Sequence, residues 1–311
     1  MEPWQFAQRQ SLPLDAKIIH SEQVIRAWWD HFDGQVCVAF SGGKDSQVLL
    51  HLVRSIYPGT KAVFADTGLE FPEVKQVVAN TPNVTIVRPD KTFKQVIEEY
   101  GYPVVSKSTA RNIRDCQNPT SRNEATRRLR LTGIKRDGTK GSSDATIPKK
   151  WKYLVDAPFK ISDRCCDFLK KAPLKKIQKE LGLYPFVGTL AAESSTRKNT
   201  YLKHGCNMFE AKQPVSLPLA IWTDQDIIQY IIRHDIKVAS VYGEIVKDNK
   251  GGFKFSDLQR TGCVFCAFGA HLEKAPNRFQ QLKVSHPKLH KYCMEDLDMK
   301  KVLQYLKIPY D

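Results

Sequence analysis

Apolar and polar positions along the chain alternate between two kinds of segment. Short apolar runs, which predict buried strands, lie at residues 36–40, 61–65, 84–87 and 185–191. Segments with apolar residues three or four positions apart, which predict helices, lie at residues 47–56, 72–79, 93–100 and 165–181. Strands that alternate with helices predict an α/β fold with a doubly wound, mostly parallel sheet. Such sheets bind ligands at the carboxyl ends of their strands.

Two further helices are predicted at the borders of this core. Aromatic residues of the first, Trp28, Trp29 and Phe32, have helical spacing and are expected to pack beside the sheet rather than to form a ligand platform. The second helix follows Thr223, a residue type that caps helix N-termini. Its buried face is expected to consist of the isoleucines at positions 227, 228, 231 and 232.

The first predicted strand runs directly into the most informative motif of the chain. Residues 41–46 read Ser41-Gly42-Gly43-Lys44-Asp45-Ser46 and precede a predicted helix. Glycines let the backbone approach an anion, successive amides point at it, and a helix N-terminus favours negative charge. Lys44 and the two serines add side-chain donors. The motif therefore predicts a phosphate-binding loop, and the alternative is a solvated Gly-Gly turn.

The spacing within this loop separates two classes of nucleotide site. The loop does not read Gly-x-x-x-x-Gly-Lys-Ser, so the P-loop NTPase class and its γ-phosphate transfer are not expected. The loop resembles instead the PP-loop of the ATP pyrophosphatase superfamily. That resemblance implies ATP as the nucleotide, with cleavage between the α and β phosphates.

A second polar stretch begins where the second predicted strand ends. It reads Asp66-Thr67-Gly68-Leu69-Glu70-Phe71-Pro72. A position at the carboxyl end of a strand places it at the border of the same crevice. Asp66 or Glu70, with Thr67 and Gly68 between them, could hydrogen-bond a ribose or hold Mg²⁺ on the phosphates. The alternative is an Asx-type turn ahead of a helix opened by Pro72.

Length and composition narrow the class of protein. A chain of 311 residues can bury a substantial core, either as one α/β domain or as a main domain with an appended module. The first thirty residues mix charged and apolar positions, so neither a signal peptide nor a membrane span is expected, and a cytoplasmic location is predicted. Eight cysteines in a cytosolic chain indicate metal or redox chemistry before disulfides.

The net charge of +15 is concentrated in one segment. Residues 107–152 contain 13 basic and 4 acidic residues, a net charge of +9, which leaves +6 for the rest of the chain. Glycines and serines interrupt the alternation of strands and helices there, so we expect an insertion or a lid. Its density of arginine predicts contact with a polyanion such as nucleic acid. A solvated charged face that serves solubility is the alternative.

Four stretches, in order, resemble the phosphoadenosine phosphosulfate (PAPS) reductase family over residues 35–270. They are residues 41–46; residues 66–68; Cys165-Cys166 with residues 193–197 beyond; and residues 218–222 with their helix, ending at Cys263-Val264-Phe265-Cys266. The resemblance implies that Glu193, Ser194 and Arg197 bind the substrate anion, because an arginine can meet phosphate or sulfate through two N–H groups. On chemistry alone, a surface turn fits these residues equally well.

The cysteine pattern resembles the ligand set of the 4Fe-4S adenylyl sulfate reductases. The four cysteines are Cys165, Cys166, Cys263 and Cys266, and four thiolates suit such a cluster or a Zn²⁺ ion. Adjacent ligands favour the cluster, because neighbouring side chains point in different directions and tetrahedral zinc sites rarely use that arrangement. The zinc alternative draws on the downstream residues His286, His290 and Cys293. Unmetallated thiols are the third alternative.

The sequence predicts an enzyme that binds ATP, adenylates an oxygen of its acceptor, releases pyrophosphate and lets sulfur displace AMP near an Fe-S cluster. Lys44, Asp45 and Asp66 are its predicted catalytic residues, and Mg²⁺ shares the charge of the departing pyrophosphate. A sulfur-donor protein is a candidate partner. The family's adenylyl sulfate reductases carry degraded PP-loops and a cysteine in a mobile C-terminal tail, whereas this loop is intact and no cysteine follows Cys293.

Two other functions remain open. One is a thiol-dependent reductase of adenylyl or phosphoadenylyl sulfate, and the other is a nucleic-acid-binding sensor that keeps the nucleotide pocket without turnover. The predicted organisation has five segments: an N-terminal helical segment (1–34), a nucleotide-binding core (35–106), a basic insertion (107–152), the rest of the α/β core (153–240) and a C-terminal metal-binding region (241–311).

Overall fold

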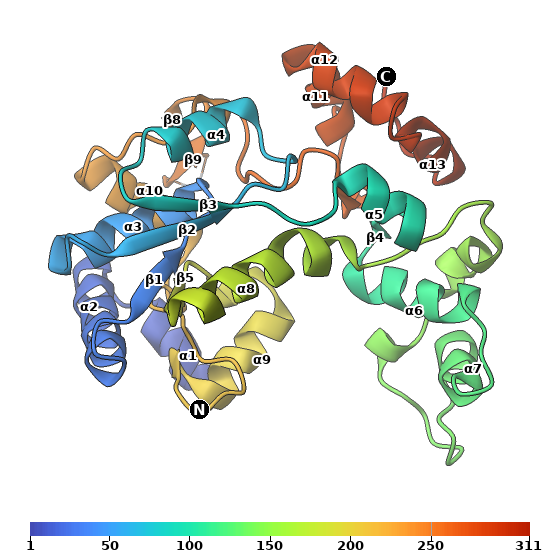
Figure 1. The fold of residues 1–311 in the computed structure, drawn as a ribbon, viewed down its shortest axis with the longest axis horizontal. Coiled ribbons are helices and arrows are strands. Elements are labelled where there is room, and N and C mark those ends of the chain that lie inside the picture. Colours follow the sequence, from blue (N-terminus) through green and yellow to red (C-terminus); the bar gives the residue numbers. More distant parts are fainter. Residues whose placement is uncertain (250) are drawn as a thin grey trace. The chain divides into compact units, whose positions relative to one another are not determined.

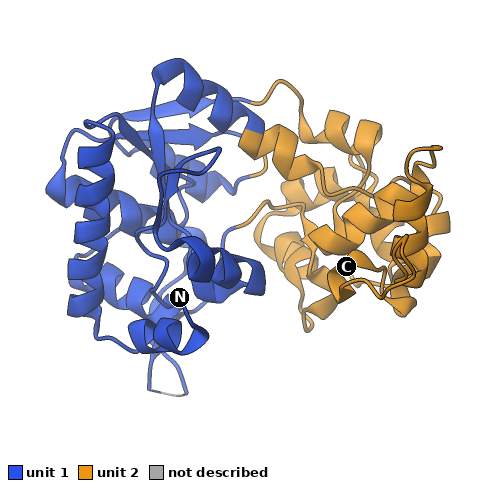
Figure 2. Ribbon diagram, turned by 90° about the horizontal axis from the view of Figure 1, so that it is seen from below, with its two compact units in different colours: residues 1–66, 70–88, 172–261 blue, residues 67–69, 89–171, 262–311 orange. Residues whose placement is uncertain are grey.

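The structure is a computed structural model that describes residues 1–249 and 251–311. Its chain forms two compact units (Figure 2). Unit 1 comprises residues 1–66, 70–88 and 172–261, and unit 2 comprises residues 67–69, 89–171 and 262–311. Each unit therefore combines segments that are far apart in the sequence. These units divide the chain at other positions than the five predicted segments, and that finer division stays a prediction.

A six-stranded sheet forms the centre of unit 1 (Figure 1). Its strands are β1 (Val36–Ala39), β2 (Lys61–Ala65), β3 (Val84–Val87), β5 (Tyr184–Val187), β6 (Asn207–Met208) and β7 (Val215–Ser216), in the spatial order β3-β2-β1-β5-β7-β6. Neighbouring strands run parallel, except that the edge strand β6 is antiparallel to β7. The predicted α/β fold with a mostly parallel sheet is confirmed.

Both faces of this sheet are covered. Val36, Cys37 and Val38 are at most 3% exposed, and because successive side chains of a strand point to opposite faces, both faces of β1 must be buried. The helices of unit 1 are α1 (Pro3–Gln10), α2 (Leu14–His31), α3 (Lys44–Ile56), α4 (Pro72–Ala79), α8 (Ala172–Leu181), α9 (Ser195–His204) and α10 (Asp224–Arg233). Helix α8 packs on β2 and β3, whereas α2, α3 and α10 pack on one another.

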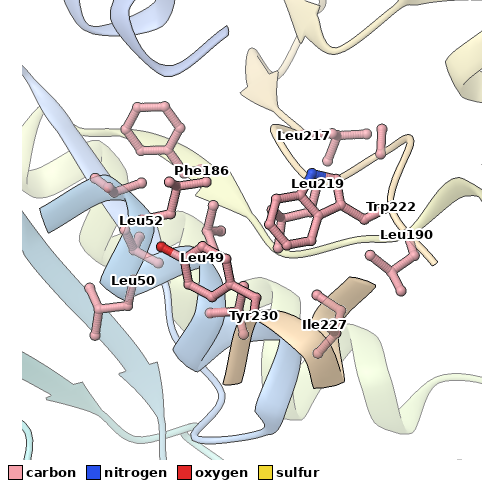
Figure 3. Close-up of a cluster of buried hydrophobic side chains, with 14 of the residues drawn as sticks. Leu49, Leu50, Leu52, Phe186, Leu190, Leu217, Leu219, Trp222, Ile227 and Tyr230 are labelled. Carbon is pink, nitrogen blue, oxygen red and sulfur yellow. The ribbon is translucent and has the colours of Figure 1, made fainter. Parts of the chain in front are cut away.

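The core of unit 1 joins the helices to the sheet (Figure 3). Leu49 and Leu52 of α3 lie near Phe186 of β5, and all three are nearly inaccessible to solvent. Trp222 and Tyr230 pack with ring centroids 5.5 Å apart. Thr223 caps α10 as predicted, since its side chain accepts a hydrogen bond from the amide of Asp226. The isoleucines at 227, 228 and 231 are buried, while Ile232 is 47% exposed and does not belong to that face.

Unit 2 is mainly helical. Its helices are α5 (Phe93–Tyr100), α6 (Lys107–Gln117), α7 (Glu124–Thr132), α11 (Arg278–Ser285), α12 (Pro287–Met294) and α13 (Met299–Tyr305), and a two-residue strand β4 (Val104–Val105) pairs in parallel with β10 (Ala267–Phe268). A small hairpin, β8 (Ile245–Lys247) with β9 (Phe253–Phe255), belongs to unit 1. Among the described residues, no helix combines the length and apolar character needed to cross a membrane.

Three predicted elements differ from the structure. The expected strand at 185–191 ends at Val187, because the chain turns at Gly188 toward the backbone of Asp45. The expected helix at 165–181 contains a π-helical stretch, Asp167–Lys171, before α8 begins. The basic segment is more ordered than an irregular insertion, since α6 buries Ala110, Ile113 and Cys116 on one face and its charged residues masked that pattern.

Candidate functional site

Two of the predicted anion-binding stretches meet at one edge of the sheet in unit 1. Strands β1 and β5 are neighbours, with β2 on the far side of β1 and β7 on the far side of β5. The strand order therefore reverses between them, which is where open α/β sheets bind ligands. Residues 41–46 follow β1 and residues 188–197 follow β5. At Gly188 an added Cβ would lie 3.0 Å from the backbone oxygen of Asp45, so the two connections approach closely.

Glycines and serines set the conformation of the loop at residues 41–46. Gly42 has a φ of +70°, and a Cβ on it would lie 2.8 Å from a methyl group of Val74, so a side chain is excluded both by conformation and by space. The Ser41 hydroxyl lies 3.0 Å from that of Ser46, which in turn donates to the Gly43 carbonyl at 2.9 Å. These bonds fold the loop back over the start of α3, whose N-cap is Gly43.

Hydroxyl groups accept hydrogen bonds from several amides of the loop. The amide of Lys44 donates to the Tyr242 hydroxyl at 3.0 Å, and that hydroxyl lies 2.8 Å from the Thr261 Oγ1. The amide of Ser41 donates to the Ser46 hydroxyl at 3.1 Å. An oxygen of a phosphate is also an acceptor, so an anion bound by these amides would take the place of the hydroxyl groups. Tyr242 and Thr261 were not predicted, because nothing in their local sequence marks them.

The Lys44 side chain is almost completely buried and held by two carboxylates. It is 3% exposed, and its Nζ lies 2.9 Å from Asp45 Oδ1 and 2.9 Å from Asp224 Oδ1. Burial alone would lower the pKa of Lys44, but the two carboxylates outweigh it and raise that pKa above its ordinary value. The buried ammonium group is thus fixed in its charged form. Asp224, the first residue of α10, was predicted only as part of a helix.

A second group of charges lies on the connection after β5. Glu193 forms ion pairs with Arg197 and with Arg260, the latter at 3.0 Å. Arg260 also lies 3.6 Å from Asp224. Burial, followed by the charge of Arg260, lowers the pKa of Arg197. The Ser194 side chain caps α9 by accepting from the amide of Arg197, so the predicted anion-binding stretch is also a helix start.

These charges form one group within unit 1. Lys44, Arg197 and Arg260 supply three cations, and Asp45, Asp224 and Glu193 supply three carboxylates. The sequence motifs identified the loop lysine and the 193–197 stretch. Arg260 and Asp224 have no motif of their own and join the group only through the fold.

The stretch that begins at Asp66 forms other contacts than the charged group around Lys44. Asp66 directly follows β2 and forms ion pairs with Lys75 at 2.7 Å and with Arg88 at 3.6 Å. The amide of Leu69 donates to the Thr67 hydroxyl at 3.2 Å, which is the geometry of a local turn. Residues 67–69 belong to unit 2, while Asp66 and Glu70 belong to unit 1. The predicted roles of Asp66, Thr67, Gly68 and Glu70 at the nucleotide stay predictions.

The four predicted cysteine ligands all belong to unit 2. The thiols of Cys166, Cys266 and Cys263 each act electrostatically on Cys165 and, with burial, raise its pKa. The pKa of Cys166 is lowered by a hydrogen bond with Cys165 and by the charges of Lys107 and Lys170. The two pairs of cysteines, 97 residues apart in the sequence, therefore influence each other electrostatically.

Local structure holds each pair in place. Cys165 and Cys166 open the helix that continues into the π-helical stretch. The amide of Cys266 donates to the Cys263 carbonyl at 3.1 Å, which closes a turn. The Arg278 guanidinium donates to the Cys266 carbonyl at 2.8 Å. Burial and the nearby Cys263 raise the pKa of Cys266 to about 11.

Within residues 1–249 and 251–311, no group of three or more His, Cys, Asp or Glu side chains is arranged to hold a metal ion. His290, named in the zinc alternative, lies 2.8 Å from the Tyr310 carbonyl through its Nε2. Cys293 is 0% exposed, and burial raises the pKa of its thiol to about 12. Cys37 is also fully buried, as predicted for a core residue of the first strand.

Twelve of the 13 basic residues in the basic segment fall into two groups, and the remaining one, Arg127, is half-buried. Arg114 pairs with Asp115 and Asp163, and Arg130 pairs with Asp115 and donates to the Ala145 carbonyl. These arginines hold α6 and α7 to their surroundings. The exposed members are Lys107, Arg111, Arg122, Arg128, Lys135, Arg136, Lys140, Lys149, Lys150 and Lys152. This exposed group is the part of the segment that the polyanion prediction concerns.

The fold is that of a doubly wound α/β protein, and the loop predicted to bind an anion lies at the point where the strand order reverses. The family model described as "Phosphoadenosine phosphosulfate reductase domain" matches residues 35–149 and 119–267. The chain therefore belongs to the PAPS reductase domain family, as its sequence motifs indicated.

Individual relatives are distant. An adenosine 5'-phosphosulfate reductase of Geobacillus thermodenitrificans is 20% identical over 75% of this chain and 78% of its own length. A similar reductase of Geobacillus kaustophilus is 27% identical over 32% of this chain and 45% of its length. Uncharacterized protein MJ0066 of Methanocaldococcus jannaschii is 26% identical over 78% of this chain. This chain spans 45% of the G. kaustophilus relative and 38% of MJ0066.

Solved structures also match this chain, and one of them is a PAPS reductase. The phosphate complex of PAPS reductase from Candida auris aligns with a TM-score of 0.41 and 13% sequence identity, covering 77% of this chain and 90% of that chain.

Proposed function

We propose that this chain is an enzyme that binds ATP at residues 41–46, transfers the adenylyl group to an oxygen of an acceptor and releases pyrophosphate. The observation that carries the proposal is the intact loop at the switch point of the sheet, with the buried, charged Lys44 at the start of α3. Family membership supports an adenine nucleotide as ligand.

Each charged group of unit 1 has a proposed role in this reaction. The acceptor oxygen attacks the α-phosphorus, the bond between the α-phosphorus and the bridging oxygen breaks, and pyrophosphate leaves with that oxygen. Lys44 and the loop amides would stabilise the charge that develops on the leaving pyrophosphate. Arg197 and Arg260 would bind the remaining anionic groups, because a guanidinium can donate two parallel hydrogen bonds to phosphate. Mg²⁺ would share this charge, with Asp45 and Asp66 as its proposed carboxylate partners.

Sulfur transfer follows in the proposed sequence. A sulfur nucleophile from a donor protein attacks the activated carbon of the acceptor, the carbon–oxygen bond breaks, and AMP leaves. We assign Cys165, Cys166, Cys263 and Cys266 as the residues that would hold a 4Fe-4S cluster. Their pattern in the sequence supports this assignment, and so does the electrostatic influence of the other three thiols on Cys165. When bound, such a cluster supplies redox-active iron and sulfide.

One rival function has a specific observation in its favour. Several relatives are named adenosine 5'-phosphosulfate reductase, so a reductase that releases sulfite is the second candidate. Its sulfur chemistry needs an accessible, reactive thiolate. Cys293, the last cysteine of the chain, is completely buried with a raised pKa, which opposes that role.

Product analysis separates these functions. With Mg²⁺ and ATP, water can serve as a slow acceptor, so we expect AMP and pyrophosphate in equal amounts and no ADP. Lys44→Ala should abolish this reaction, and Asp45→Ala should weaken it. Sulfite release from adenylyl sulfate with thioredoxin, without any pyrophosphate from ATP, would replace the proposal by the reductase. Binding of ATP with neither product would indicate the non-catalytic sensor.

A further inference from the structure

Unit 2 contains a cavity that neither the loop at residues 41–46 nor the cysteine set uses. Its volume is about 590 Å³, within the range of small-molecule sites. Four aromatic rings line it, together with two lysines and several backbone segments. These side chains are Trp151, Tyr153, His271, Tyr305, Lys150 and Lys307. All of them belong to unit 2, so the cavity is complete within one compact unit.

The rings form an aromatic cluster in which neighbouring rings are tilted to one another. Tyr153 and Tyr305 have centroids 5.6 Å apart, and Trp151 meets His271 edge to face at 5.0 Å. Trp151 is 9% exposed and anchors the group, whereas Tyr153 is 42% exposed and offers a ring face to a ligand. Exposed aromatic rings of this kind bind flat, unsaturated groups, and each base stacked on a protein ring contributes about 1–3 kcal/mol.

The charges at the cavity favour an anion next to that flat group. Lys150 and Lys307 are exposed, and Lys150 Nζ lies 5.2 Å from the centroid of the Trp151 ring. The acidic lining residue, Glu273, is neutralised because it accepts hydrogen bonds from both the amide and the guanidinium of Arg278. The lining therefore carries a net positive charge.

One polar atom at the cavity lacks a partner. The Nδ1 atom of His271 is buried and makes no hydrogen bond to any described residue. Burial, with the charge of Lys150, lowers the pKa of His271, so the ring is neutral at physiological pH. A neutral imidazole can both donate and accept, which suits the polar edge of a nucleobase.

The chain continues from this cavity into the basic segment. Trp151 and Tyr153 lie on the short 3-10 helix Lys149–Asp156, which packs against α6, and α6 packs against α7. These two helices carry several of the exposed cations. A mononucleotide would need only the cavity, whereas a strand would also use a row of positive side chains beyond it.

We propose that the cavity of unit 2 binds a nucleobase with its adjoining phosphate, supplied by a single-stranded nucleic acid whose backbone continues along the exposed cations of the basic segment. The base stacks on Tyr153 and Tyr305, and Lys150 and Lys307 meet the phosphate. This site is separate from the proposed ATP site and requires no turnover.

Fluorescence anisotropy with fluorescein-labelled twelve-nucleotide oligo-dT and oligo-U tests the proposal on the full chain, without ATP or Mg²⁺. Tyr153→Leu, which keeps an apolar side chain but removes the ring, should weaken binding about 5- to 150-fold. Tyr292→Leu is the matched control, because Tyr292 is 41% exposed and does not line the cavity. Equal affinity of both variants and the original chain would overturn the proposal.

A charge variant gives an independent readout. Lys150→Gln should flatten the slope of log affinity against log salt by about 0.7, the value for one phosphate of a single strand. Lys288→Gln, an exposed lysine outside the cavity, should leave the slope unchanged, and equal slopes in both variants would contradict the proposal. If AMP displaced the oligonucleotides at concentrations comparable to theirs, the proposal of a single-stranded nucleic acid would be wrong, and the ligand of the cavity would be a free nucleotide. Absence of ATP turnover would leave this result intact, so the two proposals fail separately.

Discussion

Replacing Asp224 by asparagine tests whether an internal carboxylate competes with phosphate for Lys44. Asp224 lies 2.9 Å from Lys44 Nζ and 3.6 Å from Arg260. The ammonium group of Lys44 has three N–H donors, of which the two carboxylates engage two. A polyphosphate that binds Lys44 therefore shares its charge with Asp224 and is repelled by that carboxylate. Asp224→Asn keeps the shape of the side chain and removes its charge. Binding of the nucleotide to Lys44 then costs less electrostatic free energy.

The magnitude follows from the exposure of the pair. The Asp224 side chain is 51% exposed, so its ion pair contributes about 0.2–1 kcal/mol rather than the larger value of a buried pair. Asp224 is also the first residue of α10, and a negative charge there stabilises the helix by about 0.3–1 kcal/mol. The variant should therefore lose about 0.5–2 kcal/mol of unfolding free energy and bind ATP up to about fivefold more tightly.

The pH dependence gives a second readout. Burial would raise the pKa of Asp224, but Lys44 and Arg260 outweigh it and lower that pKa below its ordinary value. Its contribution to stability is therefore complete above the unfolded pKa of about 3.9 and is lost as the pH falls through the lower folded pKa. The stability difference between the original chain and the variant should shrink below about pH 4 and be constant near neutrality.

Calorimetric titration with ATP and Mg²⁺, combined with urea denaturation, measures both quantities. Asp235→Asn is the matched control, because Asp235 follows the same helix, is 84% exposed and pairs only with Lys237 among the ion pairs of the described residues. Weaker ATP binding by Asp224→Asn would refute the competition and place Asp224 in contact with the nucleotide or its metal.

Three further predictions concern the loop and the cysteines. Gly42→Ala should lower the unfolding free energy by about 2–5 kcal/mol in urea denaturation, because its backbone is left-handed and an added Cβ would press on Val74. The control Gly59→Ala should change stability little, because no atom lies within 4 Å of an added Cβ there. Equal effects of the two substitutions would contradict the steric argument. Anaerobically prepared protein should contain iron and labile sulfide that Cys165→Ser or Cys266→Ser abolishes, and one zinc without iron would rule out the cluster. Cys293→Ala should cost about 1 kcal/mol of stability and leave product formation unchanged, while loss of sulfite release in this variant would restore the reductase.

The sequence predicted those elements whose signal is local. The strands at 61–65 and 84–87 and the helix at 93–100 coincide with β2, β3 and α5. Burial explains the apolar run of β2 and the helical spacing of α5. Strand β3 lies at the edge of the sheet and is not buried as expected, since Ile86 is 53% exposed. Strands β6 and β7 have two residues each, too few to show a period. The loop of residues 41–46 could be recognised because its phosphate-binding chemistry lies within six consecutive residues.

Long-range partners could not be predicted in the same way. Asp224 and Tyr242 contact Lys44 across 180 and 198 residues of sequence, and only the arrangement of the sheet brings them together. The role of Arg130 was also hidden, because a charge run does not show which arginines pair with Asp115. Cavities formed by several elements, such as that of Trp151 and Tyr305, leave no pattern in the sequence.

A comparison of nucleotide affinities tests the central claim most directly. Calorimetric titration of the full chain with ATP and with adenylyl sulfate, each with Mg²⁺, requires neither the acceptor nor the sulfur donor. A loop that binds pyrophosphate should favour ATP, and Lys44→Ala should reduce ATP affinity about 10- to 150-fold, the effect of losing one charge-assisted hydrogen bond, while changing adenylyl sulfate affinity less. Tighter binding of adenylyl sulfate than of ATP, unaffected by Lys44→Ala, would contradict the account.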